Sequence, residues 1–471
     1  MTPMSFAPQT LAMVDKQQLL RKLPKIDALL ETEESREHLD SLGRAAVVEI
    51  CREAVDRAKG RALEKGEEPS VEAIRADMTP AFRRARSDIL GRVINGTGVL
   101  LHTNMGRAPL GRELFEEIAQ AVSGYCNLEI NVLERRRGIR GPHVSKLLAQ
   151  ACGAEDAIVV NNNAAALFLI LREFASGSEV IISRGELVQI GGGFRIPDIL
   201  ESSGATLREV GTTNITSLDD FERARGPETG LMLKVHHSNF TMDGFVEAPG
   251  IRELSGLKSE EVLLVSDLGT GNFVRRTRTG PVGEPTAADM LGNGADLVCF
   301  SCDKLLGSVQ GGVIAGKREL VARLRKNPVM RVIRVDKITY AALQVVLSRH
   351  LAGKHDSIAL WRMGGEPADS VRRRAEAFLT GSGLPAERFE IVDSVATFGG
   401  GSTPGEEIPS AAIRILSDGT PDSIARGFQK EEPPLVGTVK EGAFQIDFRT
   451  ILPEDEAPLA AVLSRFIKRA S

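Results

Sequence analysis

The stretch GADLVCFSCDKLLGSVQGGVIAG, residues 294–316, decides the fold of this 471-residue chain. Its apolar run at 296–300 shows little alternation, which is typical of a strand buried on both faces of a sheet. Similar runs lie upstream, at residues 157–160, 179–182, 231–235 and 262–265. Because helical patterns separate them, the sequence predicts an α/β domain with a mainly parallel sheet covered by helices on both faces.

Lys304 follows the run at 296–300, with Ser301 before it and glycines after it. A lysine at a strand end is held rigidly, and partial burial lowers the pKa of its amine, which suits Schiff-base formation. The glycines leave room for a flat cofactor, and Ser301 can donate to a phosphate. A solvated lysine is the ordinary alternative, so this segment does not decide the function alone.

Two other predicted strand ends carry polar residues. Asp267 follows one, where a carboxylate can keep a pyridine nitrogen protonated. The other leads into three asparagines before a helix of small residues: Asn161, Asn162 and Asn163. Backbone N–H groups and amides at a helix start bind phosphate, although capping is the ordinary role of such residues. Because the carboxyl ends of parallel strands share one rim, the set predicts a pyridoxal-phosphate (PLP) site with Lys304.

The flanking regions have a different character. Residues 1–85 are predicted to be helical: apolar residues between Leu19 and Leu30 recur as one helix face, a second pattern spans 42–55, and 66–70 is a linker. Residues 351–471 predict a small α+β domain with an antiparallel sheet, because Phe444, Ile446 and Phe448 alternate with polar residues after a turn at 440–442. A helix at 458–470 follows. Three domains are therefore expected: 1–85, 86–350 and 351–471.

Composition excludes several classes of protein. A net charge of −4 and 4% aromatic residues give no support for an RNA-binding surface, although one local basic surface is not excluded. Five cysteines form no disulfide framework, and Cys299 and Cys302 are expected to be buried rather than to bind metal. With no signal peptide and no apolar stretch of ~20 residues, the sequence predicts a cytoplasmic protein without a membrane partner or a metal.

Longer motifs along nearly the whole chain resemble those of bacterial L-seryl-tRNA(Sec) selenium transferases, which are fold-type I PLP enzymes. They are LRKLPKIDALL (20–30), RVINGTGVLLHTNMGRAPL (92–110), AEDAIVVNNNAAA (154–166), SRGELVQIGGGFRIPDIL (183–200), EVGTTN (209–214), KVHHSNF (234–240), FSCDKLLGSVQGG (300–312) and GGGSTPGEEIPS (399–410). The chain departs from the family pattern at Cys302, at Ser308-Val309, at His237 and within 129–140.

The resemblance implies a reaction. PLP on Lys304 would accept the serine of seryl-tRNA(Sec), loss of the β-hydroxyl would leave a tRNA-bound aminoacrylate, and selenophosphate would add selenium. Asp303 would take part in catalysis, His236 would contact the cofactor ring, and three arginines would bind selenophosphate. These are Arg107, Arg331 and Arg334; on a helical turn the last two would share one face.

The resemblance also implies partners. The N-terminal helical domain would contact the tRNA, and the chain would form a homo-oligomer, at least a dimer and up to a decamer. One alternative is a related PLP-dependent lyase acting on a small amino acid or amino sugar acid, although such relatives tend to lack the N-terminal domain. A second alternative is an inactive RNA-binding or scaffolding protein of the same fold. Such a protein would have no reason to keep Lys304, Asp267 and the three arginines.

Overall fold

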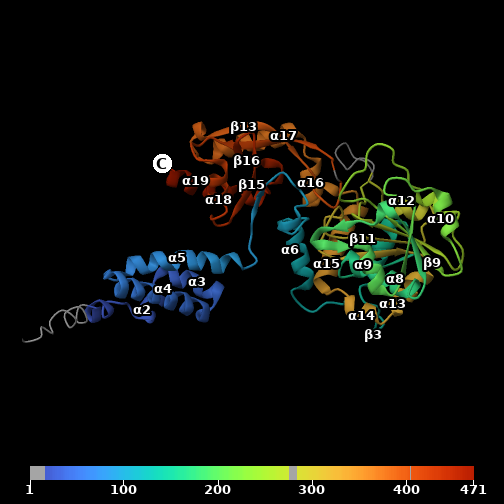
Figure 1. The fold of residues 1–471 in the computed structure, drawn as a ribbon, viewed down its shortest axis with the longest axis horizontal. Helices are drawn as coiled ribbons and strands as arrows, with labels where there is room; N and C mark the ends of the chain where they lie inside the picture. The colour runs from blue at the N-terminus through green and yellow to red at the C-terminus, as the bar shows by residue number, and fades with distance from the viewer. Residues whose placement is uncertain (1–15, 275–283, 404, 471) are drawn as a thin grey trace, which may run out of the picture. The chain divides into compact units, whose positions relative to one another are not determined.

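The structure is a computed structural model that describes residues 16–274, 284–403 and 405–470 (Figure 1). The chain forms two compact units. One spans Met1–Val93 and includes Glu432–Pro434, and the other contains Ile94–Glu431 and Leu435–Ser471. No helix within the described residues is long and apolar enough to cross a membrane.

The N-terminal unit is a bundle of helices around its own core. Its main helices are α2 (Ile26–Leu30), α3 (Glu33–Leu42), α4 (Arg44–Lys65) and α5 (Val71–Ser87). The linker predicted at 66–70 separates α4 from α5, and Ser70 caps α5 by accepting a hydrogen bond from the Ala73 N–H. The single apolar helix predicted between Leu19 and Leu30 is wrong. Residues 21–25 form a turn there, because Pro24 disfavours helix at the residue before it.

A seven-stranded sheet forms the centre of the second unit, in the order β4-β12-β11-β10-β9-β5-β8. Its strands are β4 (Asp156–Val160), β5 (Glu179–Ser183), β8 (Thr206–Val210), β9 (Thr229–Val235), β10 (Leu263–Gly269), β11 (Leu297–Ser301) and β12 (Gly312–Gly316). All five predicted strands are present. Strands β8 and β12 were not predicted, because β8 is largely exposed at the sheet edge and β12 begins and ends with glycine.

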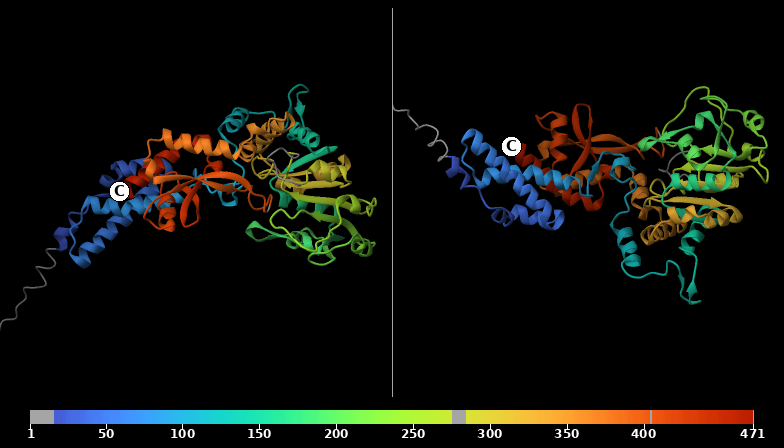
Figure 2. Two further views of the ribbon diagram at one scale, coloured as in Figure 1. Left: turned by 90° about the horizontal axis from the view of Figure 1, so that it is seen from above. Right: turned by 60° about the horizontal axis from the view of Figure 1, so that its bottom comes forward.

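Only β12 runs against the others, since it pairs antiparallel with both β4 and β11. Strands β4, β10 and β11 therefore point the same way and end at one rim of the sheet. Helices cover both faces (Figures 1 and 2). They include α6 (Arg112–Val122), α7 (Pro142–Cys152), α8 (Asn163–Phe174), α9 (Ile196–Ser203), α12 (Ala287–Gly292), α13 (Arg318–Lys326) and α15 (Lys337–Leu351). Alternate residues of the buried strands enter two separate apolar cores.

The C-terminal part of this unit contains a five-stranded sheet in the order β1-β15-β16-β14-β13. Its strands are β1 (Ile94–Gly96), β13 (Phe389–Ala396), β14 (Ile408–Ile415), β15 (Leu435–Lys440) and β16 (Ala443–Asp447), with helices α17 (Ala368–Gly381), α18 (Pro421–Phe428) and α19 (Glu456–Ala470). Glu441 and Gly442 form the predicted turn, both with positive φ. The prediction of an antiparallel sheet is wrong in one respect, because β1 joins it parallel to β15 from far away in the sequence.

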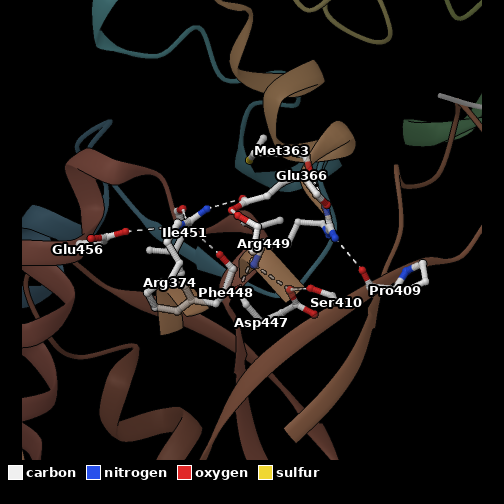
Figure 3. Close-up of polar contacts among 12 residues, drawn as sticks. Met363, Glu366, Arg374, Pro409, Ser410, Asp447, Phe448, Arg449, Ile451 and Glu456 are labelled. Carbon is white, nitrogen blue, oxygen red and sulfur yellow. Dashed lines mark hydrogen bonds and ion pairs between the residues drawn. The ribbon is translucent and has the colours of Figure 1, made fainter. Parts of the chain in front are cut away.

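A buried arginine connects this sheet to α16 (Ala359–Gly365), as Figure 3 shows. Arg449 is fully buried, and its guanidinium donates to the carbonyl oxygens of Met363 (2.5 Å), Glu366 (2.7 Å) and Pro409 (2.6 Å). Burial lowers the pKa of Arg449. Helix α16 in turn contacts the segment after β11, since Trp361 Nε1 donates to the Leu305 carbonyl at 3.0 Å. The small sheet is thereby linked to the segment that carries Lys304.

Candidate active site at the ends of three strands

Lys304 lies three residues after β11, and its side chain is almost completely buried. Burial lowers the pKa of its amine from the usual 10.5, and nearby Arg107 lowers it further, while Asp267, Asp303 and Glu284 act in the opposite direction. Two glycines with positive φ adjoin it. A Cβ at Gly269 or Gly401 would lie 3.9 Å or 3.7 Å from Lys304 Nζ. The amine is therefore held in a narrow, charged site lined by glycine.

Asp267 lies within β10, near its end, and is buried. Its Oδ1 accepts hydrogen bonds from Asn163 Nδ2 at 2.7 Å and from the Gly269 N–H at 3.1 Å. Burial raises the pKa of this carboxyl, whereas the Asn163 amide, the charge of Lys304, the Gly269 N–H and the Cys299 thiol oppose that rise. The sheet thus brings a buried carboxylate close to the buried lysine, as predicted from their strand ends.

The three asparagines make different contacts in the structure. Asn162 caps α8, because its Oδ1 accepts from the Ala165 N–H at 2.8 Å. Asn163 donates to Asp267. The Asn161 N–H donates to the Ile333 carbonyl at 2.9 Å. From the sequence, Asn163 was expected either to cap the helix or to bind phosphate. Its bond to the Asp267 carboxylate was not predicted, because Asp267 lies 104 residues further along the chain.

Arg107 and Asp303 form an ion pair beside Lys304. Arg107 Nη1 lies 3.0 Å from Oδ1 and 2.9 Å from Oδ2 of Asp303, whose side chain is only 9% exposed. Arg107 has a φ of 64°, which is uncommon for a residue with a side chain. The Ala108 N–H also donates to the Asp303 carbonyl at 3.3 Å. The loop before α6 is therefore held next to Lys304 by two contacts with Asp303, one from Arg107 and one from Ala108.

His236 and Ser301 also lie at this rim. The His236 N–H donates to the Asp267 carbonyl at 2.9 Å, and its Nε2 lies 3.0 Å from the Glu284 carboxylate. Ser301 is buried at the end of β11, opposite Gly312 of β12. Glu284 was missed by sequence reasoning, because a single glutamate between proline-containing segments carries no distinguishing signal.

Arg331 and Arg334 line a pocket of about 360 Å³. Arg331 belongs to α14 (Val329–Ile333), but Arg334 ends this helix with extended φ and ψ, so the predicted shared helix face is wrong. The carbonyl of Ile333, the residue before Arg334, accepts a hydrogen bond from the Asn161 N–H. No hydrogen bond or ion pair among the described residues joins either arginine to Arg107 or Lys304.

Cations dominate the lining of this pocket. The charged residues are Glu129, Arg137, Arg140, Arg325, Lys326, Arg331 and Arg334. Glu129 is the single carboxylate among the lining residues, and its hydrogen bond with Arg140 lowers the pKa of that carboxyl. Arg325 is also paired, with Asp156 at 2.8 Å. The excess positive charge suits an anion. Across the described part of the chain, no group of three His, Cys, Asp or Glu residues forms a metal site.

One solved structure supports the assignment of the fold. The structure of D-glucosaminate-6-phosphate ammonia-lyase is similar to this chain with a TM-score of 0.57 at 18% identity, covering 81% of this chain and 97% of that one. At this identity the likeness concerns the fold alone. The α/β architecture predicted from the sequence, that of a fold-type I enzyme with an added helical N-terminal region, is confirmed.

The sequence comparisons identify the family. The family model described as L-seryl-tRNA selenium transferase matches residues 93–452, and that described as selenocysteine synthase N terminal matches residues 20–58. The L-seryl-tRNA(Sec) selenium transferase of Carboxydothermus hydrogenoformans is 42% identical to this chain, over 93% of this chain and 96% of its own length. That of Geobacter sulfurreducens is 40% identical, over 96% of this chain and 100% of its own length. The one from Aquifex aeolicus is 37% identical over 95% of this chain and 99% of its own. This chain therefore belongs to the L-seryl-tRNA(Sec) selenium transferase family.

Proposed function

We propose that the chain is a PLP-dependent transferase that converts L-seryl-tRNA(Sec) to L-selenocysteinyl-tRNA(Sec), with Lys304 as the residue that holds the cofactor. The observation that carries this proposal is the buried Lys304 beside the buried Asp267 in a chain of this family. A lowered lysine pKa increases the fraction of neutral amine, which is the form that reacts with an aldehyde.

The residues around Lys304 fit PLP. Asp267 offers a buried carboxylate for the pyridine nitrogen, and Gly269 and Gly401 place no side chain of their own beside the lysine amine. The first N–H groups of α8 lie at the rim where a phosphate would bind, and Ser301 at the end of β11, two strands away from β4 in the sheet, would be a further donor. When bound, PLP supplies the electron sink needed for loss of the α-proton and β-hydroxyl of serine.

Asp303 is placed to handle the proton of the leaving hydroxyl. Its carboxylate is buried next to Lys304 and is oriented by both contacts with Arg107 Nη1. His236, held between Glu284 and the strand that carries Asp267, would lie against the cofactor ring. These residues orient the serine and exclude water, while the tRNA keeps its ester bond to the amino acid.

Selenophosphate is the proposed selenium donor. It is a compact oxyanion, and guanidinium groups bind such anions through paired hydrogen bonds. Arg107 lies beside Lys304, and Arg331 and Arg334 line the basic pocket. We assign the donor to these three arginines.

The N-terminal unit is the proposed tRNA contact. The last turn of α5 carries the cations Arg84 and Arg86, of which Arg86 forms an ion pair with Glu432, and such cations suit a phosphate backbone. Replacing both with glutamine should weaken tRNA binding and leave PLP loading unchanged. A charged-tRNA substrate and five free cysteines both support the proposal of a cytoplasmic enzyme. The fold class also favours a homo-oligomer, at least a dimer and up to the decamer implied by the family resemblance.

The second candidate is a PLP-dependent lyase for a small amino acid or amino sugar acid. It is favoured only by the fold shared with D-glucosaminate-6-phosphate ammonia-lyase. The match of residues 20–58 to the N-terminal family model supports the tRNA reaction instead.

An assay with two substrates separates these candidates. The holoenzyme is incubated with labelled selenophosphate and either seryl-tRNA(Sec) or free L-serine, and selenium is measured in the tRNA-bound and free amino acids. We expect label only on the tRNA, and none with Lys304→Ala. Conversion of free serine to pyruvate and ammonia, measured in a parallel incubation without tRNA, would contradict the proposal and support the lyase.

A further inference from the structure

A single amide connects the start of α8 with the carboxylate of β10. Asn163 Nδ2 donates to Asp267 Oδ1 at 2.7 Å, across 104 residues of sequence. Asn163 is the first residue of α8, directly after the capping Asn162. Its backbone is therefore fixed by the helix, and its side chain reaches the carboxylate from a rigid base.

The chemistry of the contact fixes the orientation of the amide. Asn163 Oδ1 is buried and has no hydrogen-bond partner among the described residues. A rotated amide would bring this oxygen to the Asp267 carboxylate, where two acceptors would repel each other. Burying the unsatisfied oxygen Oδ1 costs free energy, and the hydrogen bond that Nδ2 of the same amide donates to Asp267 offers a reason for it.

The Asp267 carboxylate has other neighbours that affect its charge. Lys304 is the positively charged group near it, the Gly269 N–H is a second donor to Oδ1, and the Cys299 thiol on β11 is a further donor. The His236 N–H binds the Asp267 main chain rather than its carboxylate. Asn163 and Gly269 thus fix one carboxylate oxygen, and Asn163 is the only side-chain amide in this set.

We propose that Asn163 is a positioning residue that holds the Asp267 carboxylate in the orientation in which it meets the ring nitrogen of PLP. This inference rests on the cofactor assignment made above and adds to it a role for the Asn163 side chain, which donates to Asp267. Asn163 acts through Asp267, so its loss weakens cofactor binding without removing any direct cofactor contact.

The test uses two substitutions of the full-length protein. Asn163→Ala removes the donor, and Asn163→Asp keeps the shape. The matched control is Asn293→Ala, which removes an amide hydrogen bond to Arg252 on the surface of the same unit. The dissociation constant for PLP is measured by titrating the cofactor-free protein and recording visible absorbance from pH 6 to 9, and circular dichroism verifies the fold.

The expected results differ between the variants. Asn163→Ala should bind PLP about tenfold more weakly at every pH, as loss of a group that orients a ligand commonly does. Asn163→Asp should bind nearly as the wild type at low pH, where its protonated carboxyl donates to Asp267, and lose affinity as pH rises and both carboxylates ionise. If Asn163 served packing alone, the PLP affinity of Asn163→Asp would not change with pH.

Each outcome bears on one claim. Wild-type affinity in Asn163→Ala, or equal losses in that variant and in Asn293→Ala, would overturn the role of Asn163 while the cofactor assignment stands. A wild-type protein that binds no PLP would overturn the proposed function and this inference with it.

Discussion

Arg107 holds Asp303 through Nη1, which lies 2.9 Å from Oδ2 and 3.0 Å from Oδ1 of the residue directly before Lys304. The arginine proposed to bind the selenium donor is thus paired with the carboxylate proposed to act on the leaving hydroxyl. An oxyanion that binds Arg107 competes with Asp303 for the same guanidinium. Binding of the selenium donor to Arg107 is therefore coupled to release of the Asp303 carboxylate from its ion pair with Arg107.

Replacing Arg107 should impair selenium transfer far more than folding. Arg107→Ala removes the partner of a buried carboxylate and a cation for the donor, so we expect kcat/KM for selenophosphate to fall about 10- to 100-fold, as for the loss of a charged hydrogen bond. Arg107→Lys keeps the charge and should recover part of the activity. Steady-state kinetics on seryl-tRNA(Sec) give both values. Wild-type kinetics in Arg107→Ala would contradict the role assigned to this pair.

Gly401 should be intolerant of any side chain. Its φ is +86°, and an added Cβ would lie 3.7 Å from Lys304 Nζ, so alanine both strains the backbone and narrows the cofactor site. Gly405 is the matched control, because its φ is +80° but a Cβ added there would meet nothing within 4 Å. Both alanine variants should lose similar stability, whereas only Gly401→Ala should lose PLP affinity. Equal PLP affinities would show that Gly401 does not border the cofactor.

His350 should make stability depend on pH. Its pKa is lowered from 6.5 to about 4, chiefly by burial and also by its neighbour His355, while the hydrogen bond to the Leu306 carbonyl acts in the opposite direction. Between these pH values the unfolded chain binds more protons than the folded one, so stability falls as pH falls from 6.5 towards 4.

A non-titrating variant isolates this effect. Denaturation midpoints of the wild type and His350→Gln are compared at pH 7.5 and 5. The wild type should lose more stability between the two pH values than the variant. Identical losses would mean that His350 is not buried as a neutral ring.

Arg449 should be essential for the stability of the small sheet. Replacing it with methionine leaves three main-chain carbonyls without their donors, and we expect a loss of about 3 kcal/mol or more in the free energy of unfolding. Arg372 is the control, because its partner Asp393 is almost fully exposed. Arg372→Ala should change the midpoint little, as exposed ion pairs do. A similarly small effect in Arg449→Met would contradict a stabilising role for the three Arg449 hydrogen bonds to main-chain carbonyls, which lie in the region that Figure 3 shows.

The sequence alone predicted the features that depend on local pattern. Five apolar runs predicted five strands, and chain order with strand polarity placed Lys304 and Asp267 at one rim. Strand β8 escaped prediction because its edge position leaves it largely exposed. Strand β1 escaped because its three residues pair with β15, more than 300 positions later.

Contacts between distant residues could not be predicted in the same way. The amide of Asn163 has the same sequence context as a cap or a phosphate donor, and only the fold shows that it reaches Asp267. Arg449 resembles a surface arginine until the fold places carbonyls from α16 and β14 around it. Motif resemblance pointed to Arg107 and Asp303, but their mutual pairing across 196 residues required the structure.

The covalent attachment of the cofactor tests the assignment of Lys304 most directly. The holoenzyme is reduced with borohydride, which makes the bond between PLP and its lysine permanent, and the modified peptide is identified by mass spectrometry. We predict a single phosphopyridoxyl group on Lys304, in the segment CDKLLG that follows β11. Modification of another lysine, such as Lys234 or Lys317, or no modification at all, would contradict this assignment.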